Sequence, residues 1–230
     1  GGGVARRPRA AGRAGIGLAS ASRVRHLVAL LAWLALSGGA SGASPGLLVA
    51  VGDASPLGLP FSRFSDVALD DRGRVAFVGT STAIFRRTGG AIARVIGAGD
   101  GLAGGVLAGV GAPALGGGAC LGFRAVFVNG GPAVFRRCDT HFEQIAAVGD
   151  PAPRGGAFVG FGTEVGVGPG GQVAFTALLD DASTGLFVAA LAGGVSEVAR
   201  TGSAAAAGGR LTAIRLAGVS ASGRVGFCGL

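Results

Sequence analysis

The sequence predicts an all-β fold, namely a β-propeller-like array of four-stranded antiparallel blades of about 50 residues each. Three observations predict it: a five-residue cassette that recurs, aromatic residues that return in one phase, and 48 glycines among 230 residues. Each glycine inside a helix costs about 1 kcal/mol relative to alanine. So dense a glycine content therefore favours many short strands joined by tight turns over long helices.

The cassette is a glycine followed by a short apolar run that ends in phenylalanine. It is clearest at 171–175 (GQVAF) and recurs at 73–77 (GRVAF) and 223–227 (GRVGF), with a degraded copy at 124–127 (RAVF). A glycine before an apolar run is typical of a tight turn that leads into a strand. Its recurrence indicates a repeat protein.

Three markers keep the same phase along the chain. The phenylalanines that end the cassettes are 50, 48 and 52 residues apart: Phe77, Phe127, Phe175 and Phe227. A second aromatic series, spaced by 50 and 52 residues, consists of Phe85, Phe135 and Phe187. A glycine–aspartate pair forms the third series and ends at Asp53, Asp100 and Asp150, with a degraded copy at Ser203. One structural unit therefore recurs along the chain.

Within one unit the pattern predicts four short strands and two turns, the strands at 66–69, 74–79, 82–87 and 91–97 and the turns at 70–73 and 89–90. Four short strands per unit are typical of a propeller blade. Phe77 and Phe85, on neighbouring strands, should fill the space between blades, and each buried phenylalanine contributes roughly 1.5–3 kcal/mol. A β-solenoid is the alternative, although its turns repeat faster than this period.

These units define the expected domain organisation, with a leader at 1–43 and a repeat domain at 44–230. The repeat domain should contain a lone strand, three blades and a partial blade, at 47–52, 66–98, 113–149, 161–201 and 211–230. Propellers typically have four to eight blades, so we expect an incomplete propeller, either a truncated chain or an open array. Exposed strand edges would then favour self-association with another copy.

The first 43 residues have the pattern of a secretory signal. Six arginines and no acidic residue precede residue 44, and the apolar run 27–36 (LVALLAWLAL) is followed by small residues at 37–43. This pattern predicts export, with cleavage after Ala40 or Ala43. The apolar run is too short to span a bilayer, although a single membrane anchor is the alternative. We therefore expect a mature chain without a membrane span that is secreted, periplasmic or at the cell surface.

The net charge of +8 lies mostly in this leader. From residue 44 onward, 14 arginines face all 12 acidic residues. Such a balance forms no basic stripe, and the arginines do not interleave with aromatic residues as they do in proteins that stack on bases. We expect no nucleic-acid partner.

The units resemble those of exported bacterial proteins with tandem repeats of the NxxGxVAF type, the choice-of-anchor repeat proteins. The resemblance covers about residues 47–230 and is best at 148–153 (VGDPAP), 171–175 (GQVAF) and 185–187 (GLF). This chain departs from the pattern at the asparagine, which is replaced by Asp70, Cys120, Gly168 and Ser220. The resemblance implies an exported repeat protein and no defined activity.

Three cysteines in an exported protein favour one disulfide. Cys120 and Cys138 are the candidates, because the strand order places both at the same end of one blade. Two strands are expected to lie between them, however, and a disulfide needs Cα atoms within about 7 Å. Three unpaired thiols are therefore the alternative, and Cys228 is expected to be free.

The sequence predicts neither a metal site nor a catalytic site. His141 and Cys138 form only half of a zinc-binding pattern. The recurring aspartates are typical of Asx turns, and calcium, the alternative, would need six to eight oxygen ligands from clustered carboxylates. No nucleophile elbow or HExxH motif is present. We therefore expect no cofactor, with calcium as the alternative.

Two surfaces are candidates for ligand contact. The face built from inter-blade loops and from the links between second and third strands would carry Asp53, Asp100, Asn129, Asp150, Asp180 and Asp181. A basic rim at the ends of the third strands would carry Arg86, Arg87, Arg136 and Arg137, which could hold acidic glycans. The alternative for these arginines is that they are solvated charges at strand ends.

Three functions remain open. The main hypothesis is a non-catalytic exported module that binds a glycan or a protein or interacts with a surface. A propeller-type hydrolase, lactonase-like or glycan-cleaving, would need Glu164 and the loop aspartates to converge on a metal or a sugar. A structural or degenerate fragment without ligand is the third, favoured by the irregular second unit.

Overall fold

The computed structural model describes residues 47–206 and 208–230. The fold described below is that of Gly46–Leu230, the second of the chain's two units. The predicted leader, its apolar run and its cleavage sites lie outside the described residues.

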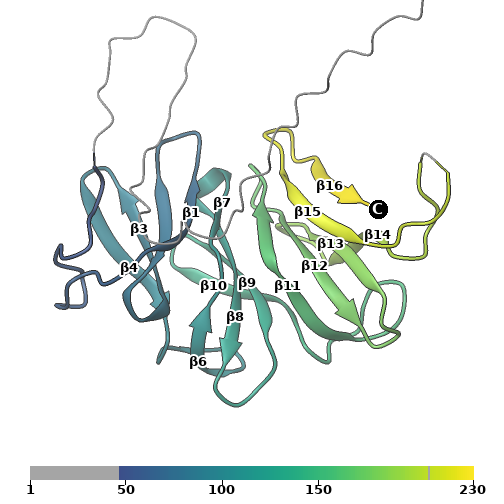
Figure 1. Ribbon diagram of the computed structural model, residues 1–230, viewed down its shortest axis with the longest axis horizontal. Coiled ribbons are helices and arrows are strands. Elements are labelled where there is room, and N and C mark those ends of the chain that lie inside the picture. Colours follow the sequence, from purple (N-terminus) through teal and green to yellow (C-terminus); the bar gives the residue numbers. More distant parts are fainter. Residues whose placement is uncertain (1–46, 207) are drawn as a thin grey trace, which may run out of the picture. The chain divides into compact units, whose positions relative to one another are not determined.

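The second unit is all-β, with four antiparallel sheets that follow one another along the chain (Figure 1). Among the described residues it contains no α-helix, and two short 3₁₀ turns lie at Thr80–Thr82 and Gly117–Ala119. This confirms the predicted propeller-like array of antiparallel blades.

The first and third sheets have the same simple order of four strands. The first contains β1 (Ser65–Leu69), β2 (Val75–Gly79), β3 (Ala83–Thr88) and β4 (Ala91–Gly97), each within one residue of the predicted bounds. The third contains β11 (Phe158–Val167), β12 (Val173–Leu179), β13 (Thr184–Ala189) and β14 (Val195–Arg200). The fourth sheet is a hairpin of β15 (Ile214–Val219) and β16 (Val225–Gly229).

The second sheet differs because its first strand is divided. Its strands are β5 (Gly101–Leu102), β6 (Gly105–Val110), β7 (Ala114–Leu115), β8 (Leu121–Phe127), β9 (Ala133–Cys138) and β10 (His141–Ala147). β6 pairs with the last residues of β8, whereas β7 pairs with its first residues. The sheet therefore begins at residue 101, earlier than the expected 113.

Hydrophobic cores lie between successive sheets. Ile84 of the first sheet and Phe135 of the second belong to one core. Val134 of the second sheet and Phe175 of the third belong to the next, and Leu186 connects the third sheet to β15 of the fourth in a smaller core. The first strands of successive sheets also contact one another, β1 with β7, β7 with β11 and β11 with β15. Neighbouring first strands are expected of the innermost strands of a propeller.

The stacked phenylalanine pairs correct the predicted position of the cassette in the second repeat. Phe77 pairs with Phe85 and Phe175 with Phe187, and in both pairs the ring centroids are 5.7 Å apart. The equivalent partner of Phe135 is Phe123, at 5.9 Å, and not the predicted Phe127. The second cassette is therefore 119–123 (ACLGF) instead of 124–127, and the true spacings of the series are 46 and 52 residues.

Backbone conformation explains why this degraded cassette still forms the turn. The cassette glycines Gly73, Gly171 and Gly223 have φ of +71°, +76° and +78°, and Ala119 has φ of +64°. An L-residue with a side chain rarely adopts this left-handed conformation, which costs roughly 1–2 kcal/mol. The second repeat therefore keeps the turn but lacks the glycine by which the turn is recognised in the sequence.

The lone strand expected at 47–52 is not formed. Residues 47–50 have no regular secondary structure, and Val51 and Gly52 lie in a turn. Among the described strands, none pairs with residues 47–50. Leu48 and Val49 instead pack against the core of Phe61, Phe77 and Phe85 on the outer face of the first sheet.

Candidate functional site

The recurring aspartates close the turns between blades. The carboxylates of Asp53, Asp100 and Asp150 each accept a hydrogen bond from the backbone N–H three residues earlier, at 2.7, 2.9 and 2.7 Å. The backbone N–H of each aspartate also donates to the carbonyl of that same earlier residue. This resembles the predicted Asx turn in using the local backbone, but the partner precedes the aspartate. The repeated carboxylates thus serve the fold.

Each of these turns also returns an apolar side chain to a core. The backbone carbonyl of each aspartate, and of Ser203 in the fourth copy, accepts a hydrogen bond from a backbone N–H seven or eight residues later. The donors are Phe61, Leu107, Phe158 and Leu211. Phe61, Leu107 and Phe158 are buried, and Leu211 packs against the smallest core. Sequence reasoning missed this fourth marker, although its nearly constant distance from the aspartate was a usable signal.

The remaining residues of the predicted acidic face are exposed at hairpin links. Asn129 and Asp180 are exposed, and Asp181 accepts hydrogen bonds from the backbone N–H and the hydroxyl of Ser183. These bonds hold the pKa of Asp181 below its usual value, with a smaller contribution from Arg200. In the described part of the chain, no three His, Cys, Asp or Glu side chains are grouped so that they could hold a metal ion.

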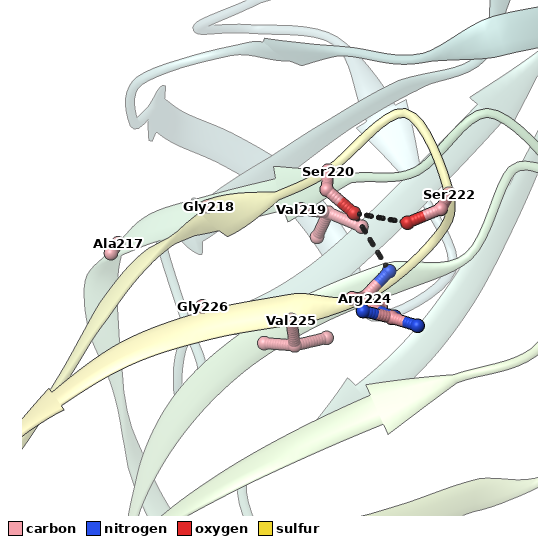
Figure 2. A pocket seen from close by; sticks show the side chains of 8 residues that line it. All are labelled: Ala217, Gly218, Val219, Ser220, Ser222, Arg224, Val225 and Gly226. Atoms are coloured by element: carbon pink, nitrogen blue, oxygen red, sulfur yellow. Dashed lines mark hydrogen bonds between the residues drawn. The ribbon is translucent and has the colours of Figure 1, made fainter.

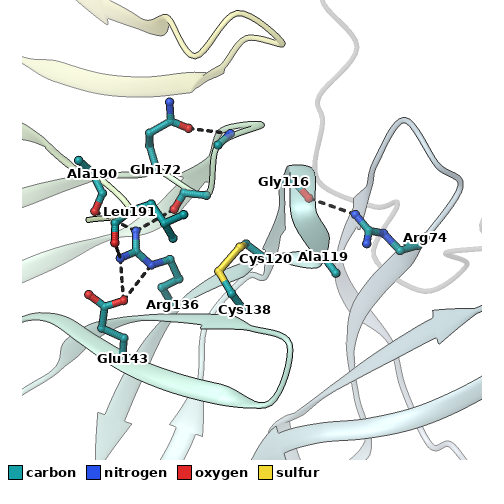
Figure 3. Close-up of a disulfide and its surroundings, with 12 residues drawn as sticks. Arg74, Gly116, Ala119, Cys120, Arg136, Cys138, Glu143, Gln172, Ala190 and Leu191 are labelled. Carbon is teal, nitrogen blue, oxygen red and sulfur yellow. Dashed lines mark hydrogen bonds and ion pairs between the residues drawn. A yellow bond between two sulfur atoms is a disulfide. The ribbon is translucent and has the colours of Figure 1, made fainter. Parts of the chain in front are cut away.

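Arg136, predicted on an exposed basic rim, is instead buried between the second and third sheets, with 1% of its surface exposed. Its guanidinium donates to the carbonyls of Gly171, Ala190 and Leu191 of the third sheet at 2.8, 3.1 and 3.1 Å (Figure 3). It also forms an ion pair of 2.6 Å with Glu143 on the neighbouring strand. The rim prediction is wrong for Arg136, because this face of β9 is covered by the next blade.

The other three predicted rim arginines are half-buried. Arg86 donates a long hydrogen bond of 3.4 Å to the carbonyl of Ala119 in the second sheet. Arg137 lies over the ring of Phe142, 5.2 Å from its centroid. Burial and the charge of Arg86 lower the pKa of Arg137, while Asp139 opposes this shift. Arg87 lies next to Arg86 on β3.

A disulfide joins Cys120 to Cys138 at the end of the second sheet where β8 begins and β9 ends (Figure 3). The expectation that two strands lie between these cysteines is wrong. β8 and β9 are paired neighbours, and Leu121 lies opposite Arg137, so the adjacent cysteines face each other with Cα atoms 4.2 Å apart. Cys228 is an exposed free thiol.

The first and second sheets are also connected through Asp70 and Arg74. The guanidinium of Arg74 donates to the Asp70 carboxylate. At 3.2 Å it also donates to the carbonyl of Gly116 in the second sheet (Figure 3). Burial alone would raise the pKa of Asp70, but hydrogen bonds from Arg74 and Arg72 outweigh it and lower that pKa. Asp70 therefore acts as an ionised anchor for an inter-blade contact.

A family comparison assigns the chain to a family but gives it no activity. The family of unknown function DUF7453 matches residues 35–227, which is most of the chain. The chain belongs to this family. No curated protein matches it. None of the helices in the described part of the chain is long and apolar enough to cross a membrane.

Within the span shared with this family, an open, shallow depression of ≈ 560 Å³ lies on the β15–β16 hairpin (Figure 2). It is lined by residues 217–220, 222 and 224–226. The hydroxyl of Ser220 accepts a hydrogen bond from the backbone N–H of Arg224 and lies 3.0 Å from the hydroxyl of Ser222. Arg224 is the only ionisable side chain in this lining, so the depression lacks a pair of groups for acid–base chemistry.

Proposed function

We propose that this chain is an exported repeat protein that acts as a non-catalytic binding or surface-interaction module. One observation carries the proposal: the charged groups that recur with the blades are bonded to backbone. Asp53, Asp100 and Asp150 close turns, and Arg136 joins two blades. We therefore expect a ligand to contact surface residues that differ from one blade to the next.

Export is supported by the signal-like leader and by the disulfide between Cys120 and Cys138, because disulfides persist mainly in oxidising compartments. The resemblance to choice-of-anchor repeat proteins points in the same direction. Fusion of residues 1–43 to a reporter enzyme that is active only after export tests this part. We expect an active reporter, and activity that remains after charge reversal of the leader arginines would count against a signal role.

The binding role is tested with the full chain against a panel of neutral and acidic oligosaccharides and of lactone and glycoside substrates. We expect saturable binding to at least one saccharide and no turnover. The hydrolase alternative depends most on Glu164, an exposed residue of β11. Turnover that the substitution Glu164→Gln abolishes would replace the binding proposal by that alternative.

Self-association is a second mode of interaction that one observation favours. Phe227 on β16 is 37% exposed, whereas its equivalents Phe77, Phe123 and Phe175 are buried. Among the described strands β16 pairs only with β15. A strand edge without a partner can pair with a second copy. Sedimentation at increasing concentration should show dimers that Phe227→Lys weakens, and a concentration-independent monomer would rule this mode out.

A further inference from the structure

Arg86 and Arg137 lie on opposite sides of the junction between the first and second sheets. On β3, Arg86 follows Ile84 by two positions, and Ile84 belongs to the core shared with the second sheet. On β9, Arg137 follows Phe135 by two positions, and Phe135 belongs to the same core. Because side chains two apart on a strand share a face, both guanidiniums point into this junction.

Further contacts place the two side chains at the same end of the junction. Arg86 donates to the carbonyl of Ala119, the residue before Cys120. Cys120 is bonded to Cys138, the residue after Arg137. Arg137 also packs on Phe142, which lies against the core between these two sheets.

These two cations lack the carboxylate that the next junction provides. At the second junction, Glu143 lies opposite Arg136 on the neighbouring strand and binds it. At the first junction, the residue opposite Arg86 is Ala93. Asp139, an exposed residue of the β9–β10 turn, is the acidic group that acts on Arg137. Neither guanidinium thus has an ion-pair partner among the described residues.

The hydrogen-bonding capacity of the pair is also largely unused. The Nε atom of Arg137 is buried and has no hydrogen-bond partner among the described residues. Arg86 makes one long bond to a carbonyl. A guanidinium presents its N–H groups as a planar fork that matches the oxygens of a carboxylate or a sulfate. Burial and, after it, repulsion from Arg86 lower the pKa of Arg137, and a bound anion would relieve this repulsion.

We propose that Arg86 and Arg137 form an oxyanion-binding site at the first inter-blade junction, which takes a carboxylate or sulfate group of an acidic saccharide. The proposal rests on the binding function proposed above and names its ligand class. Phe142 provides an apolar surface beneath the Arg137 guanidinium, which holds the fork in place for the anion.

The test measures binding of the full chain to a sulfated oligosaccharide, a uronate oligosaccharide and a neutral oligosaccharide by titration calorimetry. We expect the acidic saccharides to bind and the neutral one not to bind. Arg86→Gln and Arg137→Gln should each weaken binding at least 10-fold. Arg137→Lys keeps the charge but loses the fork, and should fall between the wild type and Arg137→Gln.

Arg87→Gln is the matched control, because Arg87 is a half-buried neighbour on the same strand whose side chain points to the other face of the sheet. Its affinity should equal that of the wild type, and thermal melts should show all variants folded. Equal losses in Arg87→Gln and Arg86→Gln would overturn the site, because they would indicate diffuse charge attraction. Binding of inorganic sulfate without either acidic saccharide would overturn the assigned ligand class.

The two proposals can fail separately. Saccharide binding that is unchanged in Arg86→Gln and Arg137→Gln overturns this site but leaves the binding module intact. Turnover that depends on Glu164 overturns the proposed function, whatever the arginine variants do.

Discussion

The junctions on the two sides of the second blade use the same strand position differently. In both, an arginine follows the stacked phenylalanine of the third strand, Arg86 at the first junction and Arg136 at the second. Arg136 binds three carbonyls and Glu143, whereas Arg86 faces Arg137 and makes one long bond. The residue that pairs with this arginine on the fourth strand differs as well: it is alanine at the first junction and glutamate at the second. An arginine recurring in a repeat can thus be structural in one copy and available to a ligand in the next.

Breaking the second junction should have the largest effect. Arg136→Met would leave the carbonyls of Gly171, Ala190 and Leu191 without this donor and Glu143 without its ion-pair partner, and is expected to lower the free energy of unfolding by about 4 kcal/mol. Arg86→Met should cost less than about 1 kcal/mol. Denaturant unfolding of both variants measures this difference, and equal costs would show that the two junctions are alike.

Removing the disulfide that lies between the two junctions should come next. The double variant Cys120→Ala/Cys138→Ala should lose about 3 kcal/mol, since the cysteines are separated by 18 residues and the cross-link limits the unfolded chain. Cys228→Ala, which removes the exposed free thiol, is the control. Urea midpoints measured with and without reductant should differ for the wild type and for Cys228→Ala, but not for the double variant.

Acid should weaken the first junction through Asp70. Its pKa is lowered in the folded protein, so the stabilisation is present above the unfolded pKa of about 4 and is lost as pH falls through the folded pKa. At neutral pH, Asp70→Asn should cost about 2 kcal/mol through weaker hydrogen bonds with Arg74 and Arg72. Unfolding curves at neutral and acid pH should converge for the two proteins, and a constant difference would exclude ionisation as the cause.

Exchanging glycine and alanine at equivalent turn positions should change the free energy of unfolding by about 1 kcal/mol, in opposite directions. Ala119→Gly relieves a left-handed alanine and should stabilise the protein, whereas Gly73→Ala introduces the same strain where no heavy atom would contact the new methyl group. Thermal melts should move in opposite directions. Shifts of the same sign would mean that the two turns are not equivalent.

Introducing an arginine–glutamate pair like Arg136–Glu143 at the junction between the third and fourth sheets should have the smallest effect. There, Val188 lies opposite Ser196, as Arg136 lies opposite Glu143. Val188→Arg alone should destabilise the protein because Val188 packs against the core between the third and fourth sheets. Adding Ser196→Glu should recover about 0.5–1 kcal/mol. A double-mutant cycle measures this coupling, and zero coupling would show that the position needs the surrounding carbonyls as well.

Much of the fold follows from local pattern, because turn glycines and alternating apolar residues act over a few positions. The strands of the first sheet lie within one residue of their predicted bounds for this reason. Phe123 was not predicted, because Ala119 occupies a glycine position and conceals the cassette. The burial of Arg136 was not predictable either, since it depends on Gly171, Ala190 and Leu191 of another blade. Contacts between blades leave no periodic signal in a single unit.

A cross-link that ties the start of β8 to the end of β9 holds this hairpin whatever residue precedes it. Ala119 can therefore occupy a position that the other blades fill with glycine. The disulfide therefore allows the residue in this turn to vary while the backbone follows the same path.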